Sequence, residues 1–164
     1  MTRGRPPVWN PIASLDATVW TEAVEVASKG RLGIPVAARR CLGWWDDHVE
    51  DGLLASLEQG GLASLVPWAP AGIEMMGRVG NLIRGTSAAE RGELVLAAMD
   101  RFMRVGCEAN GRLVLPANLM AHIDPLGTGK ARVIVLHGQL QLCAEHEWQA
   151  AREARLALLD ALKS

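Results

Sequence analysis

The residues best suited to bind a ligand form a glycine–arginine turn, and this turn occurs twice in the sequence. Lys29-Gly30-Arg31 returns as Asn110-Gly111-Arg112, and the two glycines lie 81 positions apart. Glycine accepts the positive φ of a tight turn, and a planar guanidinium can pair with two acceptors of a guanine or a phosphate. The pattern therefore predicts two contacts for a nucleic acid. The alternative is that Arg31 and Arg112 form structural ion pairs that brace the turns.

Further arginines lie near these turns or at the start of the chain. Arg39 and Arg40 fall on a predicted short helix after the first turn, where they could contact phosphates. Arg3-Gly4-Arg5-Pro6 matches the core of a minor-groove AT-hook, in which Arg3 and Arg5 would enter a narrow groove. The motif is short, and an irregular tail without DNA contact is the alternative. Acidic residues at 46–51 leave open whether the first turn can approach DNA.

Other constellations do not support catalysis or metal binding. Gly127-Thr128-Gly129-Lys130 is followed by Ala131 and a predicted strand, whereas a phosphate loop needs Ser or Thr and a helix. Cys143 and His146 have no paired second motif of the kind that zinc sites use. We therefore expect no enzyme activity, no cofactor and no metal.

The repeat extends beyond the turns into a shared order of elements. Pro35 and Pro116 both follow an apolar strand and lead into a short helix. The first copy predicts strands at 23–27, 31–34, 53–57 and 62–66, and a helix at 36–42. The second copy predicts strands at 112–115, 133–136 and 140–143, and a helix at 116–123. One unit of this size buries too little apolar surface alone, so we expect the two units to pack together as a pseudo-dimer.

These elements divide the chain into five predicted parts. They are an irregular arm at 1–20, a first unit at 21–69, a helical connector at 70–103, a second unit at 104–148 and a C-terminal helix at 145–163. In the connector, Ser87 and Glu90 have the spacing of a capping box, which predicts a helix over 88–103. The last helix carries an apolar side with Trp148, Leu156, Leu159 and Leu162.

Composition sets the cellular context that we expect. The 164 residues carry a net charge of −1, so any nucleic-acid surface must be local. Three widely spaced cysteines do not form a disulfide framework and indicate reduced thiols. No apolar segment has the length of a membrane span, and no signal peptide opens the sequence. We expect a soluble, cytoplasmic protein.

The repeated pattern resembles the AbrB/SpoVT-type swapped-hairpin DNA-binding domain. Two such units joined by a helical connector resemble the MraZ family of bacterial transcriptional regulators. The similarity covers about residues 22–150 and is stronger in the second unit, from Glu108 to Leu119. The family's turn reads Asp-x-x-Gly-Arg, and here the acidic position is Ala27 in the first unit and Glu108 in the second.

The resemblance implies an α+β fold of two tandem β-barrel units. It also implies a regulator, more specifically a repressor, that binds repeated promoter elements as a homo-oligomer with a possible ring form, associated with the nucleoid. The contacts to double-stranded DNA would come from Lys29, Gly30, Arg31, Arg39, Arg40 and Arg112, with the turn of the first unit as the principal element.

Two other functions remain open. An antitoxin-like or adaptor protein would use the same fold and bind a protein partner through the apolar stripe of its C-terminal helix. A small-molecule-binding or enzymatic domain would need a deep pocket with converging polar groups, which the residue pattern does not indicate.

Overall fold

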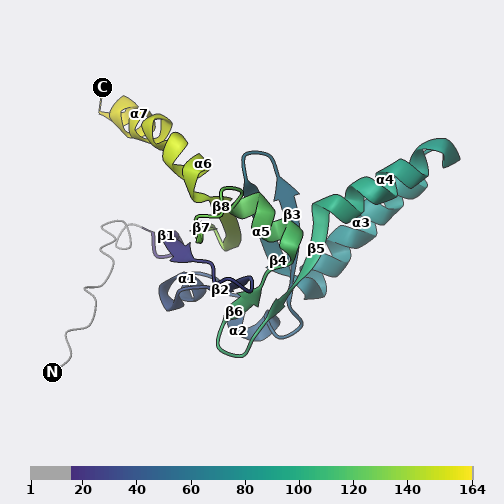
Figure 1. Cartoon of the computed structure of the whole chain (residues 1–164), viewed down its shortest axis with the longest axis horizontal. Helices are drawn as coiled ribbons and strands as arrows, with labels where there is room; N and C mark the ends of the chain where they lie inside the picture. Colours follow the sequence, from purple (N-terminus) through teal and green to yellow (C-terminus); the bar gives the residue numbers. More distant parts are fainter. Residues whose placement is uncertain (1–15, 164) are drawn as a thin grey trace.

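A nearly closed antiparallel β-barrel with attached helices forms the α+β fold of this chain (Figure 1). The structure is a computed structural model and describes residues 16–163. Within that range, eight strands pair in the order β1-β7-β8-β4-β3-β5-β6-β2. A bridge between Val26 and Leu32 brings the first and last strands together, which nearly closes the barrel.

The strands are short, as the turn-rich sequence predicts. They are β1 (Trp20–Glu25), β2 (Arg31–Gly33), β3 (Leu53–Glu58), β4 (Leu62–Pro67), β5 (Phe102–Cys107), β6 (Arg112–Val114), β7 (Lys130–Leu136) and β8 (Gln139–Ala144). The helical segments are α1 (Val36–Arg40), α2 (Trp45–His48), η1 (Trp68–Gly72), α3 (Ile73–Arg84), α4 (Ala88–Arg101), α5 (Ala117–Ile123), α6 (Glu145–Ala150) and α7 (Arg152–Leu162).

Most strand pairs join a segment before α3 to a segment after α4. β1 pairs with β7, β3 with β5, β4 with β8 and β2 with β6. Leu32 lies directly opposite Leu113, and neither side chain is exposed to solvent. The two halves of the chain therefore build one sheet and one core together, because the edges of each half are completed by strands of the other.

The core fills the barrel with leucine, valine and isoleucine. Fully buried side chains include Leu53, Leu65, Leu140 and Leu142 from the sheet. The short helices α1 and α5 add residues to the same core, and the largest of these is Leu119. Because each helix directly follows a proline, the chain leaves the ladder after β2 and β6 and turns across the barrel.

Some elements differ from those that the sequence predicts. α2 was not predicted, and α3 lies in the predicted helical connector although a helix was assigned there only at 88–103. That helix ends at Arg101, because Phe102 and Met103 begin β5, a strand that was not predicted. The single C-terminal helix is two helices, α6 and α7, that meet at Ala151. The Arg155 side chain donates a hydrogen bond to the carbonyl of Trp148, an acceptor that a continuous helix would use itself.

Two helical extensions leave the barrel on different sides (Figure 1). The antiparallel pair α3 and α4 projects to one side and α7 to the other, and the described side chains of these helices include none that is buried. Exposed apolar residues concentrate here, among them Leu82, Leu96, Met99, Leu158 and Leu162. Of the helices that the structure describes, none combines the length and apolarity needed to cross a bilayer.

Candidate nucleic-acid interface

The two glycine–arginine turns have the same backbone geometry and lie beside each other. Gly30 and Gly111 adopt φ of +77° and +84°. In the first turn the amide of Gly30 donates to the carbonyl of Ala27, and in the second the amide of Gly111 donates to that of Glu108. The turns then interlock, since Leu115 donates its amide to the Gly30 carbonyl at 2.8 Å. Pairing of β2 with β6 thus brings Arg31 and Arg112 to one outer surface.

Arg31 is held by a carboxylate from the other half of the chain. Its Nε donates to Glu108 Oε1 at 3.0 Å, and the two side chains remain 37% and 39% exposed. The structural ion pair that the sequence left open for Arg31 is therefore present. The guanidinium is not enclosed, however, so it keeps donors that face solvent. An exposed pair of this kind contributes about 0.2–1 kcal/mol.

Arg112 has the same place in its turn but not the same partner. The residue corresponding to Glu108 in the first half is Ala27, which carries no acceptor. Arg112 is exposed, and within residues 16–163 no carboxylate lies within ion-pair distance of its guanidinium. The alternative interpretation of Arg112, a structural ion pair, is therefore not observed among the described residues.

A polar cleft of about 330 Å³ joins these two arginines to the loop before β7. Its walls include Arg31, Arg112, Thr128, Gly129 and Lys130. Glu25 also lines it, so the cleft combines three cations with one carboxylate. Three cations that line one cleft suit a phosphate group, whose oxygens accept several charge-assisted hydrogen bonds.

Residue pattern alone did not assign Lys130 to this site. The tetrad Gly127-Thr128-Gly129-Lys130 is not a phosphate loop, and a strand follows it as expected. It reaches the arginines because β7 pairs with β1, where Lys130 lies opposite Glu25. Asp124 holds the loop through hydrogen bonds from Thr128 and Gly129 at 2.8–2.9 Å. Burial opposes ionisation of Asp124, but these hydrogen bonds outweigh it and lower the pKa of the carboxyl.

The other predicted contact residues take different positions. Lys29 is exposed at the tip of the first turn. Arg39 lies with its guanidinium against the backbone of Gly111, and its buried Nε has no hydrogen-bond partner among the described residues. Arg40 is exposed and lines a shallow cleft with Arg39 and Asp46. Arg3 and Arg5 lie outside the described residues.

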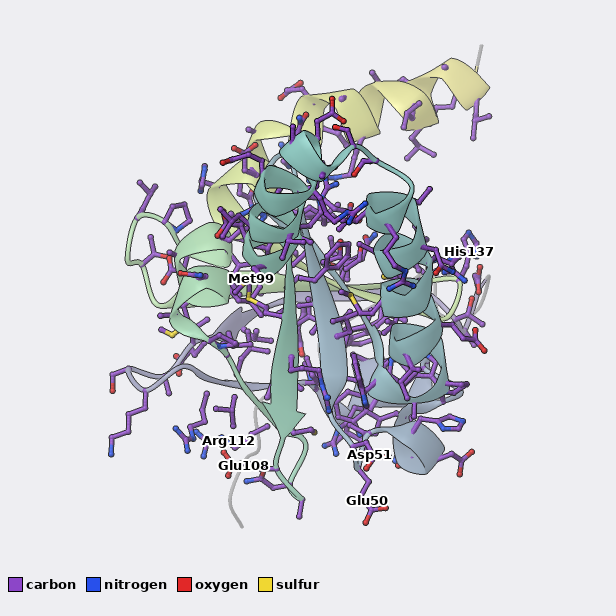
Figure 2. The ribbon with its side chains drawn as sticks, turned by 90° about the vertical axis from the view of Figure 1, so that its right-hand side faces the viewer. Glu50, Asp51, Met99, Glu108, Arg112 and His137 are labelled. Carbon is purple, nitrogen blue, oxygen red and sulfur yellow. The ribbon has the colours of Figure 1, made fainter. Side chains whose placement is uncertain are left out.

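The acidic residues at 46–51 lie on α2 and in the segment that leads into β3. Asp51 and Glu50 are exposed, at the same end of the molecule as Glu108 and Arg112 (Figure 2). Arg104 donates to the Asp51 carbonyl at 2.7 Å and stacks on Trp68, which ties this segment to the barrel. The carboxylates thus share one end of the protein with the arginine turns.

Metal and thiol chemistry find little support in the part of the chain that the structure describes. No group of three or more His, Cys, Asp or Glu residues there could hold a metal ion. Cys41, Cys107 and Cys143 are free, and burial is the main reason that the pKa of each thiol is raised. Raised pKa values keep these thiols protonated and weakly reactive.

Comparison with protein-family models gave no match, and comparison with curated proteins gave no similar protein.

Proposed function

We propose that this protein is a sequence-specific DNA-binding regulator built from two tandem swapped-hairpin units of the AbrB/SpoVT type, in the manner of the MraZ family. The observation that carries the proposal is the convergence of two glycine–arginine turns on one exposed surface. Interlocked pairing of β2 with β6 supports the pseudo-dimer, because Leu32 and Leu113 are repeat equivalents and pair with each other. Cytoplasmic location, nucleoid association and repression belong to the same proposal.

The local charge of this surface explains how DNA binding is compatible with a net charge of −1. Lys29, Arg112 and Lys130 are exposed cations on adjoining elements, and Arg31 keeps donors free beside its carboxylate. Backbone hydrogen bonds hold both turns, so the backbone that carries Arg31 and Arg112 is already ordered before DNA binds. A guanidinium at the tip of a turn can enter the major groove and pair with guanine, which is worth about 1–3 kcal/mol against a wrong base.

The direct test is binding of fluorescent duplexes selected from random sequence, measured at several salt concentrations. We expect Arg112→Ala and the double variant Lys29→Ala, Arg31→Ala to weaken binding and to flatten its salt dependence, as lost phosphate contacts require. Arg152→Ala removes an exposed cation from α7 and is the matched control. Wild-type protein that selects no sequence, or variants that bind as the control does, would contradict the proposal.

The pair α3 and α4 supports self-association. Two apolar grooves run along opposite flanks of the seam between these helices. One has Met76, Val95 and Met99 along its flank, and the other has Leu82 and Leu94. Because the two grooves have different linings, one groove of a copy can contact the other groove of the next copy in a head-to-tail arrangement. Such an arrangement closes into a ring when the rotation between neighbouring copies allows it.

Light scattering tests this assembly. Leu82→Glu places a charge in one groove, so we expect a shift from oligomer to monomer. Leu126→Glu is the control, because Leu126 is 70% exposed and Leu82 75%, but Leu126 lies in the loop after α5. A wild-type monomer, or equal effects of both variants, would argue against the hairpin as the interface.

One observation keeps the adaptor function as a second candidate. α7 contacts the rest of the protein mainly through α6, and Leu158 and Leu162 are 72% and 82% exposed. A short amphipathic helix of this kind fits the groove of a protein partner. Copurification of a stable partner with wild-type protein, lost in Leu158→Glu, would favour this function over DNA binding.

A further inference from the structure

The surface that carries Arg31 and Arg112, here called the arginine surface, has two sides. The backbone is arranged equivalently on both sides, but the charged residues differ. Val24 of β1 pairs with Ala131, and its repeat equivalent Val105 of β5 pairs with Leu53. The segments that precede these partners therefore occupy corresponding places beside the two turns. The segment before Ala131 is Thr128-Gly129-Lys130, and the segment before Leu53 is Glu50-Asp51-Gly52. One side thus receives Lys130 where the other receives the carboxylates of Glu50 and Asp51. Glu25 adds one carboxylate to the Lys130 side, where its repeat equivalent on the other side is Gly106.

The turns themselves repeat this difference. Ala27 and Glu108 make the same backbone contact, each donating its amide to the carbonyl of the arginine in its own turn, at 2.9 and 2.8 Å. Glu108 uses its carboxylate to hold Arg31. Ala27 has no carboxylate to hold Arg112, which stays open toward the cleft with Lys130 and Thr128. Arg112 is therefore an unpaired cation toward Lys130, whereas the charge of Arg31 is partly neutralised by Glu108.

We infer that the surface is polarised and that DNA backbone phosphate binds on the side of Arg112 and Lys130. Glu108, Glu50 and Asp51 disfavour phosphate on the opposite side, through like-charge repulsion. This inference rests on the proposed DNA-binding function. It makes Ala27 a specificity-determining residue, because the missing carboxylate leaves Arg112 free. On a selected site of asymmetric sequence, each copy of the protein should therefore lie in one orientation.

Transfer of the carboxylate between corresponding positions tests the polarity. Ala27→Glu places an acid where the second turn has one, so Arg112 should become ion-paired as Arg31 is. Ala27→Gln has nearly the same size without the charge and is the control. Ala27 is exposed, and its backbone bonds do not depend on its side chain. Thermal melting of each variant checks that the fold is retained.

Binding to a short mixed-sequence duplex and to a selected duplex provides the affinity measurement. We expect Ala27→Glu and Lys130→Ala each to weaken binding about tenfold, the worth of one lost hydrogen bond between charged groups. Ala27→Gln should bind within about twofold of wild type, because it leaves the Arg112 charge contact intact. Glu108→Ala removes repulsion from the other side and should leave affinity equal or higher.

The orientation is read with a DNA-cleaving probe attached to a cysteine. A probe at Ser28→Cys should cut to one side of a single asymmetric selected site, and a probe at its repeat equivalent, Ala109→Cys, to the other; both residues are exposed and neither is a proposed contact. Cutting on both sides of that site from a single probe, or Ala27→Glu that binds as tightly as Ala27→Gln, would overturn the polarity while DNA binding itself survives. Wild-type protein that binds neither duplex would instead overturn the proposed function.

Discussion

Replacement of Arg39 by Met tests whether positions 39 and 120, which correspond in the two copies of the repeat, accept the same side chain. The guanidinium of Arg39 lies against Gly111, so that a Cβ there would be 2.7 Å from Nη1. Its repeat equivalent, Met120, lies the same way against Gly30, with Sδ 2.8 Å from the corresponding point. The Arg39 Nε is buried and has no partner among the described residues. Arg39→Met therefore removes an unsatisfied donor and installs a side chain that the other half already accommodates.

The expected gain follows from the cost of that donor. A buried donor left without a partner costs about 1–3 kcal/mol. Because Arg39 is only partly buried, we take the lower end and expect Arg39→Met to raise the free energy of unfolding by about 1 kcal/mol. For a protein of this length, that corresponds to a rise of about 2–4 °C in the melting temperature.

Urea unfolding followed by tryptophan fluorescence measures this change. Arg40→Met is the matched control, because it removes the same charge from the next, exposed residue. Its free energy of unfolding should stay within about 0.5 kcal/mol of wild type. A loss of stability in Arg39→Met, or a gain no larger than that of Arg40→Met, would refute the equivalence of positions 39 and 120.

Two further predictions concern the closure of the barrel and the base of α6. Leu113→Ala should lower the free energy of unfolding by about 2–5 kcal/mol, since the side chain is fully buried opposite Leu32; in urea unfolding, a loss below about 1 kcal/mol would be inconsistent with that pairing. Glu145 is partly buried, which opposes its ionisation, but hydrogen bonds from Arg132 and Gln149 and the charge of Arg132 hold its pKa below the ordinary 4.5. A carboxyl with a lowered pKa stabilises the fold above its unfolded pKa and loses that contribution as pH falls through its folded pKa. Melting temperatures between about pH 7 and pH 3 should therefore decline less steeply in Arg132→Gln than in wild type, and equal slopes would show that this pair does not carry the dependence.

Local chemistry explains what could be predicted from the sequence. Gly30 and Gly111 allow the positive φ of their turns, and the strands β2 and β6 follow where alternating apolar residues predict them. Pro35 and Pro116 end each strand before a short helix. These features depend on a few neighbouring residues, so the repeat and the α+β class were readable before any long-range contact was known. The division into domains and the assignment to DNA remain predictions.

The helical parts were harder to predict. α3 lies inside the predicted helical connector, but its bounds were not assigned because Gly77 and Gly80 lower the helix propensity of this segment. The C-terminal helix was expected to be continuous. At its break, the Arg155 side chain bonds to the Trp148 carbonyl and stacks on the Trp148 ring at 3.8 Å. A hydrogen bond of this kind leaves no periodic signal in the sequence.

By itself, the sequence determined the two turns, their arginines and the strands that follow them, because φ preference and alternation act over a few residues. Only the tertiary structure decided that Glu108 holds Arg31, that Arg112 stays open, and that Lys130 joins it. These outcomes depend on which strands pair and in what register, and β-sheet register couples residues as far apart as positions 31 and 108. A carboxylate found in one turn therefore acts on the arginine of the other.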